Sequence, residues 1–203
     1  ADGDNMGTAI DHLTTLPNPQ DEHRRLSVAL SQFATEVEKI VKEHAGVLVY
    51  SGGDDVLAYL PLHRVLNCAN SLAVTFAKQM QNFKTKKGVS PTLSTGIVVA
   101  HHLDPLSDTL ELVRDAERTA KTVPGKNALA ITVSKRSGVD RTIQGKRLEL
   151  GSRLQQMIEW RRSGAISAGV AYELQALDRL LGASTVPDEA RIAEAMRIIK
   201  RKR

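Results

Sequence analysis

The stretch VLVYSGGDDVLAYL, residues 47–60, decides the fold that we expect for this chain. Two short apolar runs rich in β-branched residues, 47–50 and 56–60, flank the segment Ser51-Gly52-Gly53-Asp54-Asp55. Apolar runs separated by a few turn residues that include glycine predict a β-hairpin. The glycine pair and the two aspartates then lie on or beside its tip, where turn geometry can bring neighbouring side chains toward one ligand.

Helical and strand patterns alternate around this hairpin. Apolar residues at three-and-four spacing predict helices at residues 22–44, 66–83 and 106–120. Strands are predicted at residues 92–102 and 128–133. Helices interleaved with short strands favour an α+β fold, a ferredoxin-like or cyclase-like sheet of about five strands covered by helices.

Both ends of the chain differ from this pattern. The opening segment ADGDNMG, residues 1–7, resembles the end of a buried strand, so we expect a fragment whose first strand is truncated. After Gly138 only helical periodicity remains, at residues 148–162, 165–181 and 187–200. We therefore predict two domains, an α+β domain at residues 1–138 and an all-α domain at residues 139–203.

The charge of the chain is divided unevenly. Residues 1–134 hold 13 basic and 15 acidic side chains, whereas residues 135–203 hold 15 and 8, so the net charges are −2 and +7. The basic part fits contact with a polyanion, although a solvated basic surface explains it equally well.

Composition excludes other classes of protein. No run approaches the roughly 20 consecutive apolar residues that cross a bilayer, so we expect no membrane contact and a cytoplasmic location. Cys68 is the only cysteine, which rules out an internal disulfide and a thiolate metal cage within this chain. A buried structural thiol is the expected role of Cys68.

Four aspartates are the candidate metal ligands. Asp2 and Asp4 are two residues apart, so on a strand their side chains share one face. In a split β-α-β sheet the first strand runs beside one hairpin strand, which would bring both toward Asp54 and Asp55. Crowded carboxylates raise one another's pKa values unless cations neutralise them, and hard oxygen ligands favour Mg²⁺ or Mn²⁺ over zinc. The alternative is turn formation for Asp54 and Asp55, with no metal role for the other pair.

The hairpin glycines add to this site. Gly52 and Gly53 permit positive φ angles and leave the backbone open to a phosphate or ribose. His101 and His102 are expected to be structural, because neighbours on a strand face opposite ways and at most one could point into a site.

Four ordered segments together resemble the large subunit of type III CRISPR effector complexes, in particular its Cmr (III-B) branch. They are ADGDNMG at 1–7, YSGGDDVLAYLPL at 50–62, TGIVVAHH at 95–102 and PGKNALAI at 124–131. The residues after 138 are similar to the carboxy-terminal helical domain of that subunit, less specifically. Its palm domain is similar to those of GGDEF diguanylate cyclases and nucleotide cyclases.

The resemblance implies an activity and its partners. It implies a nucleotidyltransferase that uses two Mg²⁺ or Mn²⁺ ions to make cyclic oligoadenylate, an antiviral second messenger, from ATP. The partners that it implies are the other subunits of the effector complex, guide RNA and target RNA. Synthesis would occur when the complex holds target RNA.

The resemblance also assigns residues by position. Asp54, Asp55 and Asp2 would be catalytic and would bind metal, together with the Gly3 carbonyl and the less certain ligand Asp4. Ser51, Gly52 and Gly53 would line the nucleotide, and Lys121 and Lys126 would face the triphosphate. A helix-end lysine and a turn lysine are the alternatives for the last two.

Other functions stay open. Asp55-Val56 stands where a diguanylate cyclase has Glu-Phe, which argues against an enzyme that makes cyclic di-GMP from GTP. A catalytically silent palm could instead be a scaffold, whose basic helical part binds guide or target RNA or partner subunits. The base preference rests on the resemblance alone, so a cyclase of another product class is a third possibility.

Overall fold

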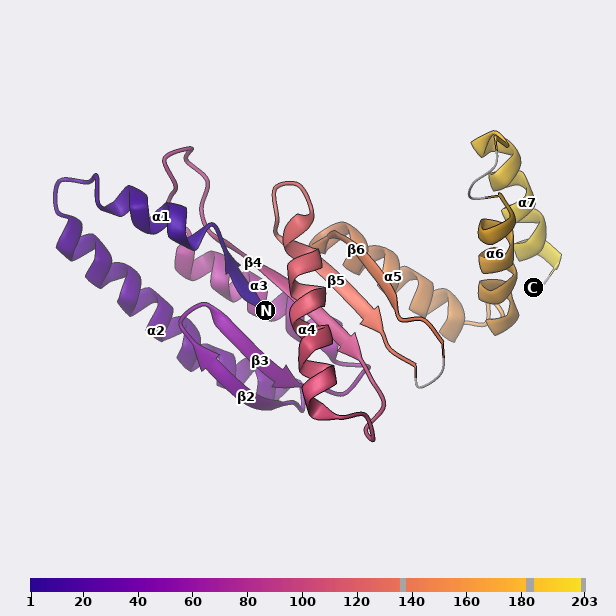
Figure 1. Cartoon of the computed structure of the whole chain (residues 1–203), viewed down its shortest axis with the longest axis horizontal. Helices are drawn as coiled ribbons and strands as arrows, with labels where there is room; N and C mark the ends of the chain where they lie inside the picture. The colour runs from indigo at the N-terminus through magenta and orange to yellow at the C-terminus, as the bar shows by residue number, and fades with distance from the viewer. Residues whose placement is uncertain (136–137, 182–184, 202–203) are drawn as a thin grey trace. The chain divides into compact units, whose positions relative to one another are not determined.

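The computed structural model describes residues 1–135, 138–181 and 185–201, and the chain forms two compact units, 1–151 and 152–203 (Figure 1). The elements up to residue 146 are β1 (Asp2–Asp4), α1 (Met6–Leu13), α2 (Pro19–Glu43), β2 (Val47–Gly52), β3 (Asp55–Tyr59), α3 (Val65–Met80), β4 (Thr92–Val99), α4 (Leu106–Thr122), β5 (Ala128–Val133) and β6 (Arg141–Lys146). They are followed by α5 (Arg147–Arg162), α6 (Ala168–Leu181) and α7 (Asp188–Arg201). The predicted α+β fold followed by carboxy-terminal helices is confirmed.

The strands of the first unit form a four-stranded sheet and a hairpin. The sheet order is β1-β4-β5-β6, in which only β4 and β5 are parallel. Strands β2 and β3 pair with each other. Ala1 joins the two sheets, because its backbone nitrogen donates to the Val56 carbonyl at 2.8 Å and its carbonyl accepts from the Val56 N–H at 2.9 Å. The expectation that the first strand runs beside a hairpin strand is therefore confirmed.

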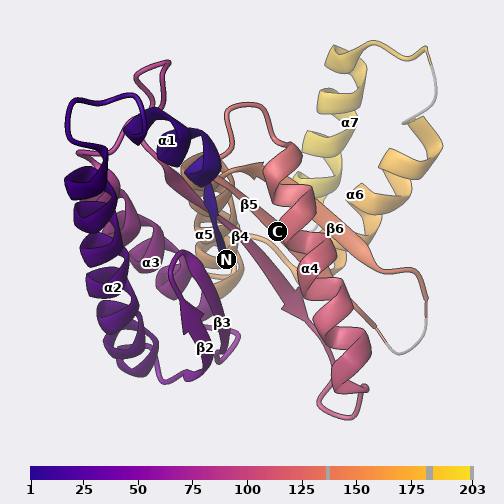
Figure 2. The same ribbon diagram turned by 60° about the vertical axis from the view of Figure 1, so that its left-hand side comes forward.

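Helices cover the strands on both faces (Figure 2). Helices α2 and α3 pack together around Phe33 and Phe76, whose rings meet edge to face with centroids 5.0 Å apart. Leu93 of β4 belongs to the same core. Helix α4 packs against β4 and β5. Because side chains alternate along a strand, β4 can serve a core on one side and α4 on the other.

Gly96, in the middle of β4, lies directly against the backbone of α4. A Cβ added to Gly96 would stand 2.8 Å from the carbonyl carbon of Ala116 and 2.9 Å from the Cα of Glu117. Both are backbone atoms, so no side chain can turn aside to make room. Helix α4 can therefore lie this close to the sheet only because Gly96 has no side chain. The polar side chains near the end of α4 depend on the same close packing.

We expect Gly96→Ala to lower the free energy of unfolding by about 1 to 3 kcal/mol, because overpacking forces a helix away from the sheet. Urea unfolding of the purified chain measures the change. Gly7→Ala is the control, since a methyl group there meets nothing within 4 Å. Equal stability of Gly96→Ala and the parent protein would contradict the close packing described above.

Three sequence-based expectations need correction. Residues 141–146 form β6 although only helices were expected after Gly138; this strand is polar and mostly exposed at the sheet edge, so it lacks the apolar alternation of a half-buried strand. Strand β4 ends at Val99 instead of residue 102. His101 and His102 therefore lie in a turn, with ring centroids 4.4 Å apart instead of on opposite faces. The predicted domain limits, 1–138 and 139–203, stay a prediction.

Two further expectations concerned Cys68 and membrane-spanning helices. Cys68 is fully buried, and burial raises the pKa of its thiol to about 11, as expected for a structural cysteine. Of the helices in the described ranges, none combines the length and the apolar character that a membrane crossing requires.

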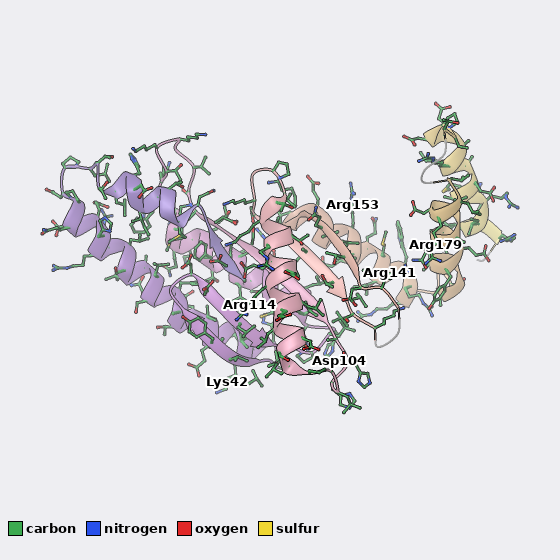
Figure 3. All side chains as sticks on the ribbon, viewed as in Figure 1. Lys42, Asp104, Arg114, Arg141, Arg153 and Arg179 are labelled. Atoms are coloured by element: carbon green, nitrogen blue, oxygen red, sulfur yellow. The ribbon has the colours of Figure 1, made fainter. Side chains whose placement is uncertain are left out.

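The second unit is helical within its described residues. Helices α6 and α7 pack together, Val170 and Ile198 are buried, and Arg201 pairs with Glu173. Both units expose basic side chains, labelled in Figure 3: Arg114 and Arg141 in the first, Arg153 and Arg179 in the second.

Candidate functional site

The tip of the β2–β3 hairpin is a two-residue loop. Gly52 pairs with Asp55, which leaves Gly53 and Asp54 to make the turn. Gly53 has a φ of 64°, a conformation that favours glycine. A methyl group on Gly53 would meet nothing within 4 Å, so the backbone at the tip is open on that side. Next to it, the Ser51 hydroxyl is buried without a hydrogen-bond partner among the described residues.

The Asp54 side chain lies against the backbone of Gly3 in β1. A Cβ built on Gly3 would collide with the Asp54 Oδ2 and stand 2.8 Å from the Asp54 Cβ. Burial and the neighbouring Asp55 raise the pKa of the Asp54 carboxyl, while hydrogen bonds from the backbone N–H groups of Asp54 and Gly3 oppose the rise. The hairpin tip thus places a carboxylate directly on the first strand.

Asp2 and the end of α4 form a second group of charges. The Asp2 carboxylate pairs with the Lys121 ammonium, which also lies 3.6 Å from a Glu117 carboxylate oxygen. These three side chains are only 24 to 25% exposed. Burial, and then the nearby Lys126, lower the pKa of Lys121. One ammonium therefore bridges a carboxylate of β1 and a carboxylate of α4.

The two groups of charges belong to one site. Burial raises the pKa of Glu117. The Ala1 amino group and Arg118 oppose the rise, whereas the Asp55 and Asp4 carboxylates add to it. Asp54 lies against Gly3, and the adjacent Asp2 pairs with Lys121, so β1 connects the hairpin tip to the end of α4. Segments β1, the β2–β3 tip and the end of α4 converge on a single polar region.

Asp4 has a different environment from Asp2. Its side chain is fully buried, and its Oδ2 accepts from the hydroxyls of Thr92 at 2.7 Å and Ser94 at 2.9 Å. The same oxygen accepts from the Asn127 N–H at 3.0 Å. Asp4 therefore ties β1 to β4 and to the residue before β5. Its Oδ1 is buried with no hydrogen-bond partner in the described part of the chain.

Lys126 lies in the turn that enters β5. Its φ of 51° and that of Asn127, 49°, place both residues in the left-handed region. The turn is braced from β6 and α5: Lys146 Nζ donates to the Lys126 carbonyl at 2.8 Å, and Arg147 Nε donates to Asn127 Oδ1 at 3.1 Å. The turn that carries Lys126 is thus held by several contacts beside the site.

The donor set suits a hard divalent cation. Asp2, Asp54 and Asp55 offer carboxylate oxygens from two segments. Burial raises the pKa of Asp54, and the neighbouring Asp55 carboxylate raises it further. As the side chains stand, no group of three or more His, Cys, Asp or Glu residues within the described ranges encloses a metal position. Lys121 supplies the positive charge at Asp2. The chemistry of these oxygen donors fits a hard divalent cation, whereas their present arrangement has Lys121 at Asp2.

Comparison with known proteins identifies the family. The model of the Cas10/Cmr2 second palm domain matches residues 1–130. This chain belongs to that family. The palm resembles the CRISPR system Cmr subunit Cmr2 of Pyrococcus furiosus, with 44% identity over 118 residues, and the CRISPR system CMR subunit Cmr2 of Saccharolobus solfataricus, with 29% over 100 residues. These matches cover 57% and 41% of this chain, but 13% and 10% of the relatives' lengths.

A solved structure supports the fold of this palm. The structure titled Type III-B Cmr-beta Cryo-EM structure of the Apo state matches with a TM-score of 0.58 and 21% identity. The match covers 89% of this chain and 21% of that chain. At this identity the likeness concerns the fold alone.

The structure brings some of the predicted site residues together and not others. Asp54 lies against Gly3 at the hairpin tip, and Lys121 pairs with Asp2. Among the described contacts, none joins the Asp2 carboxylate to Asp54 or Asp55. Asp4 is engaged in holding strands, so its role as a ligand stays a prediction. Glu117 was missed in the sequence. Its only signal there is the spacing of four residues to Lys121, which is also common on solvated helix faces.

Proposed function

We propose that this palm binds ATP together with two divalent cations and synthesises cyclic oligoadenylate. The observation that carries the proposal is the convergence of Asp54 and Asp55 on β1, beside Asp2 and the lysine of α4. Family membership supports the assignment, and the choice of ATP rests on the resemblance to cyclase palms of the type III effector subunit. The proposed product would serve as an antiviral second messenger.

Different residues would bind the cations and the nucleotide in this reaction. Asp2, Asp54, Asp55 and the Gly3 carbonyl would hold the cations. When bound, the cations would lower the pKa of the attacking ribose 3′-hydroxyl and neutralise the triphosphate. Gly53 keeps the hairpin backbone open toward a phosphate or ribose. The expectation of an open backbone is wrong for Gly52, because the Tyr50 hydroxyl lies where a methyl group on Gly52 would stand.

The lysines act on the leaving group in this proposal. Lys121 and Lys126 would place positive charge beside the triphosphate, where charge develops as pyrophosphate departs. No side chain needs to act as a dedicated base, since positioning and electrostatic stabilisation supply most of the rate in this class of reaction.

We also propose that the palm works inside a Cmr-type complex with other subunits, guide RNA and target RNA. The relatives are named as CRISPR Cmr subunits, which supports this setting. Exposed arginines offer basic contacts for RNA or partner subunits: Arg141 on β6 and, later in the sequence, Arg153 and Arg179.

The test combines binding with product analysis. Calorimetric titration of ATP into this chain should show binding that requires Mn²⁺ or Mg²⁺. An effector complex that contains this palm, supplied with ATP, Mn²⁺ and target RNA, should release cyclic oligoadenylate detectable by mass spectrometry. Failure to form oligoadenylate both with and without target RNA would refute the proposed activity.

A catalytically silent scaffold is the second candidate. It is favoured by one observation: Lys121 already neutralises Asp2, and the described acids do not enclose a metal position. For a scaffold, RNA binding should weaken as salt rises and should be untouched by Asp54→Ala and Asp55→Ala. For the enzyme, the same substitutions should remove cation-dependent ATP binding.

A further inference from the structure

Lys121 is held by two carboxylates that belong to different parts of the fold. Its ammonium pairs with Asp2 of β1 and lies 3.6 Å from the carboxylate of Glu117, one turn earlier on α4. The three side chains are about three-quarters shielded from solvent. Such a bridge is weakly screened by salt compared with an exposed ion pair.

Both partners of Lys121 are fixed by the backbone. Asp2 pairs with Ser94 in the sheet, and α4 is pressed against Gly96 at Ala116 and Glu117. Glu117 and Lys121 share a helix face because they are four residues apart. The lysine side chain is the one long, flexible member of the group, so it can exchange partners while the two backbones stay in place.

The charge balance makes such an exchange favourable. Asp2, Asp54, Asp55 and Glu117 bring four acidic groups to this region, and Lys121 contacts only the first and the last. A divalent cation at Asp2 would repel the Lys121 ammonium. With Glu117 already within 4.0 Å, Lys121 keeps a paired, partly buried position after it leaves Asp2. Without Glu117, the same departure would leave a partly buried ammonium without that partner.

We propose that Lys121 is an exchangeable internal counter-ion: it neutralises Asp2 in the cation-free protein and moves to Glu117 when a divalent cation binds Asp2. Glu117 is then a positioning residue that retains Lys121 beside the nucleotide phosphates. This inference rests on the proposed function, because it assumes that Asp2 is a cation ligand.

The experiment measures Mn²⁺ binding to the nucleotide-free chain by electron paramagnetic resonance. Lys121→Met should tighten the Kd for Mn²⁺ about five- to tenfold, because the competing ammonium is gone. Lys126→Met is the charge-matched control, since Lys126 lies near Lys121 but has no ion pair with Asp2 among the contacts described. Lys126→Met should change the Kd for Mn²⁺ by a factor at least threefold smaller than Lys121→Met does. Equal effects of the two substitutions would overturn the exchange, because general charge would then explain both.

Glu117→Gln tests the second partner. It should weaken Mn²⁺ binding about three- to tenfold in the parent chain, and its effect should largely disappear in the Lys121→Met background. An equal loss in both backgrounds would show that Glu117 acts on the cation directly and would overturn its role as the alternative partner of Lys121. Circular dichroism melting of each variant identifies any that fails to fold, and Lys121→Gln and Glu117→Ala then replace it.

The same data separate this inference from the proposed function. Mn²⁺ binding by the parent chain with no change in Lys121→Met would overturn the exchange and leave the cation site intact. Binding that emerges only in Lys121→Met would also overturn the exchange, because Lys121 would then block Asp2 permanently instead of moving to Glu117. No binding in any variant would overturn both.

Discussion

Asp54→Ala and Asp55→Ala are each expected to reduce cation-dependent ATP turnover about 1,000-fold, the largest effects that we predict. Both residues lie beside the hairpin tip, and the Asp54 carboxylate contacts Gly3 beside Asp2. Loss of either removes an oxygen donor that no other side chain in the hairpin replaces. The measurement is oligoadenylate formation by the assembled complex, with Mn²⁺ and target RNA present.

The isosteric changes Asp54→Asn and Asp55→Asn separate charge from shape. They should abolish turnover almost as fully, because a neutral amide is a poor ligand for a hard cation. Since the pKa of Asp54 is raised in the folded protein, its charged form costs stability at neutral pH. Asp54→Asn should therefore raise the Tm of the cation-free chain, by about 2 °C. Asp11→Asn, at an exposed position of α1, is the control. Full activity of Asp54→Asn or Asp55→Asn would contradict the proposed role of that carboxylate as a cation ligand.

Asp4→Ala is expected to lower the free energy of unfolding by about 3 kcal/mol, the largest stability effect among these substitutions. Its Oδ2 accepts three hydrogen bonds, and the substitution leaves all three donors without this acceptor, the buried Ser94 hydroxyl among them. Urea unfolding without cation or nucleotide measures the loss. Asp4→Asn keeps one acceptor oxygen and should cost less.

The opposite outcome for Asp4 is equally informative. Unchanged stability together with lost Mn²⁺ binding would return Asp4 to the set of cation ligands and would give its unpartnered Oδ1 that role. Asp11→Ala should leave both stability and Mn²⁺ affinity unchanged, because this side chain is exposed.

Much of the palm could be predicted from sequence because its signals are local. The hairpin follows from two apolar runs around a glycine pair, and α2, α3 and α4 follow from apolar spacing. Strand β6 gave no such signal, because it is a polar edge strand whose partner, β5, supplies its only pairing in the described sheet. This segment is a strand because it pairs with β5, and its own residues carry no apolar alternation that would predict a strand.

By itself the sequence determined the elements other than α1 and β6, the turn at Gly53 and the chemical character of the site, because periodicity, turn residues and carboxylates are properties of short segments. Only the tertiary structure decided which charge faces which. Asp2 and Asp4 are near neighbours in the chain, yet one pairs with Lys121 at the site and the other is buried among strand hydroxyls. That difference arises because α4 and β4 approach β1 from distant parts of the chain, and each aspartate meets whatever partner the packing brings.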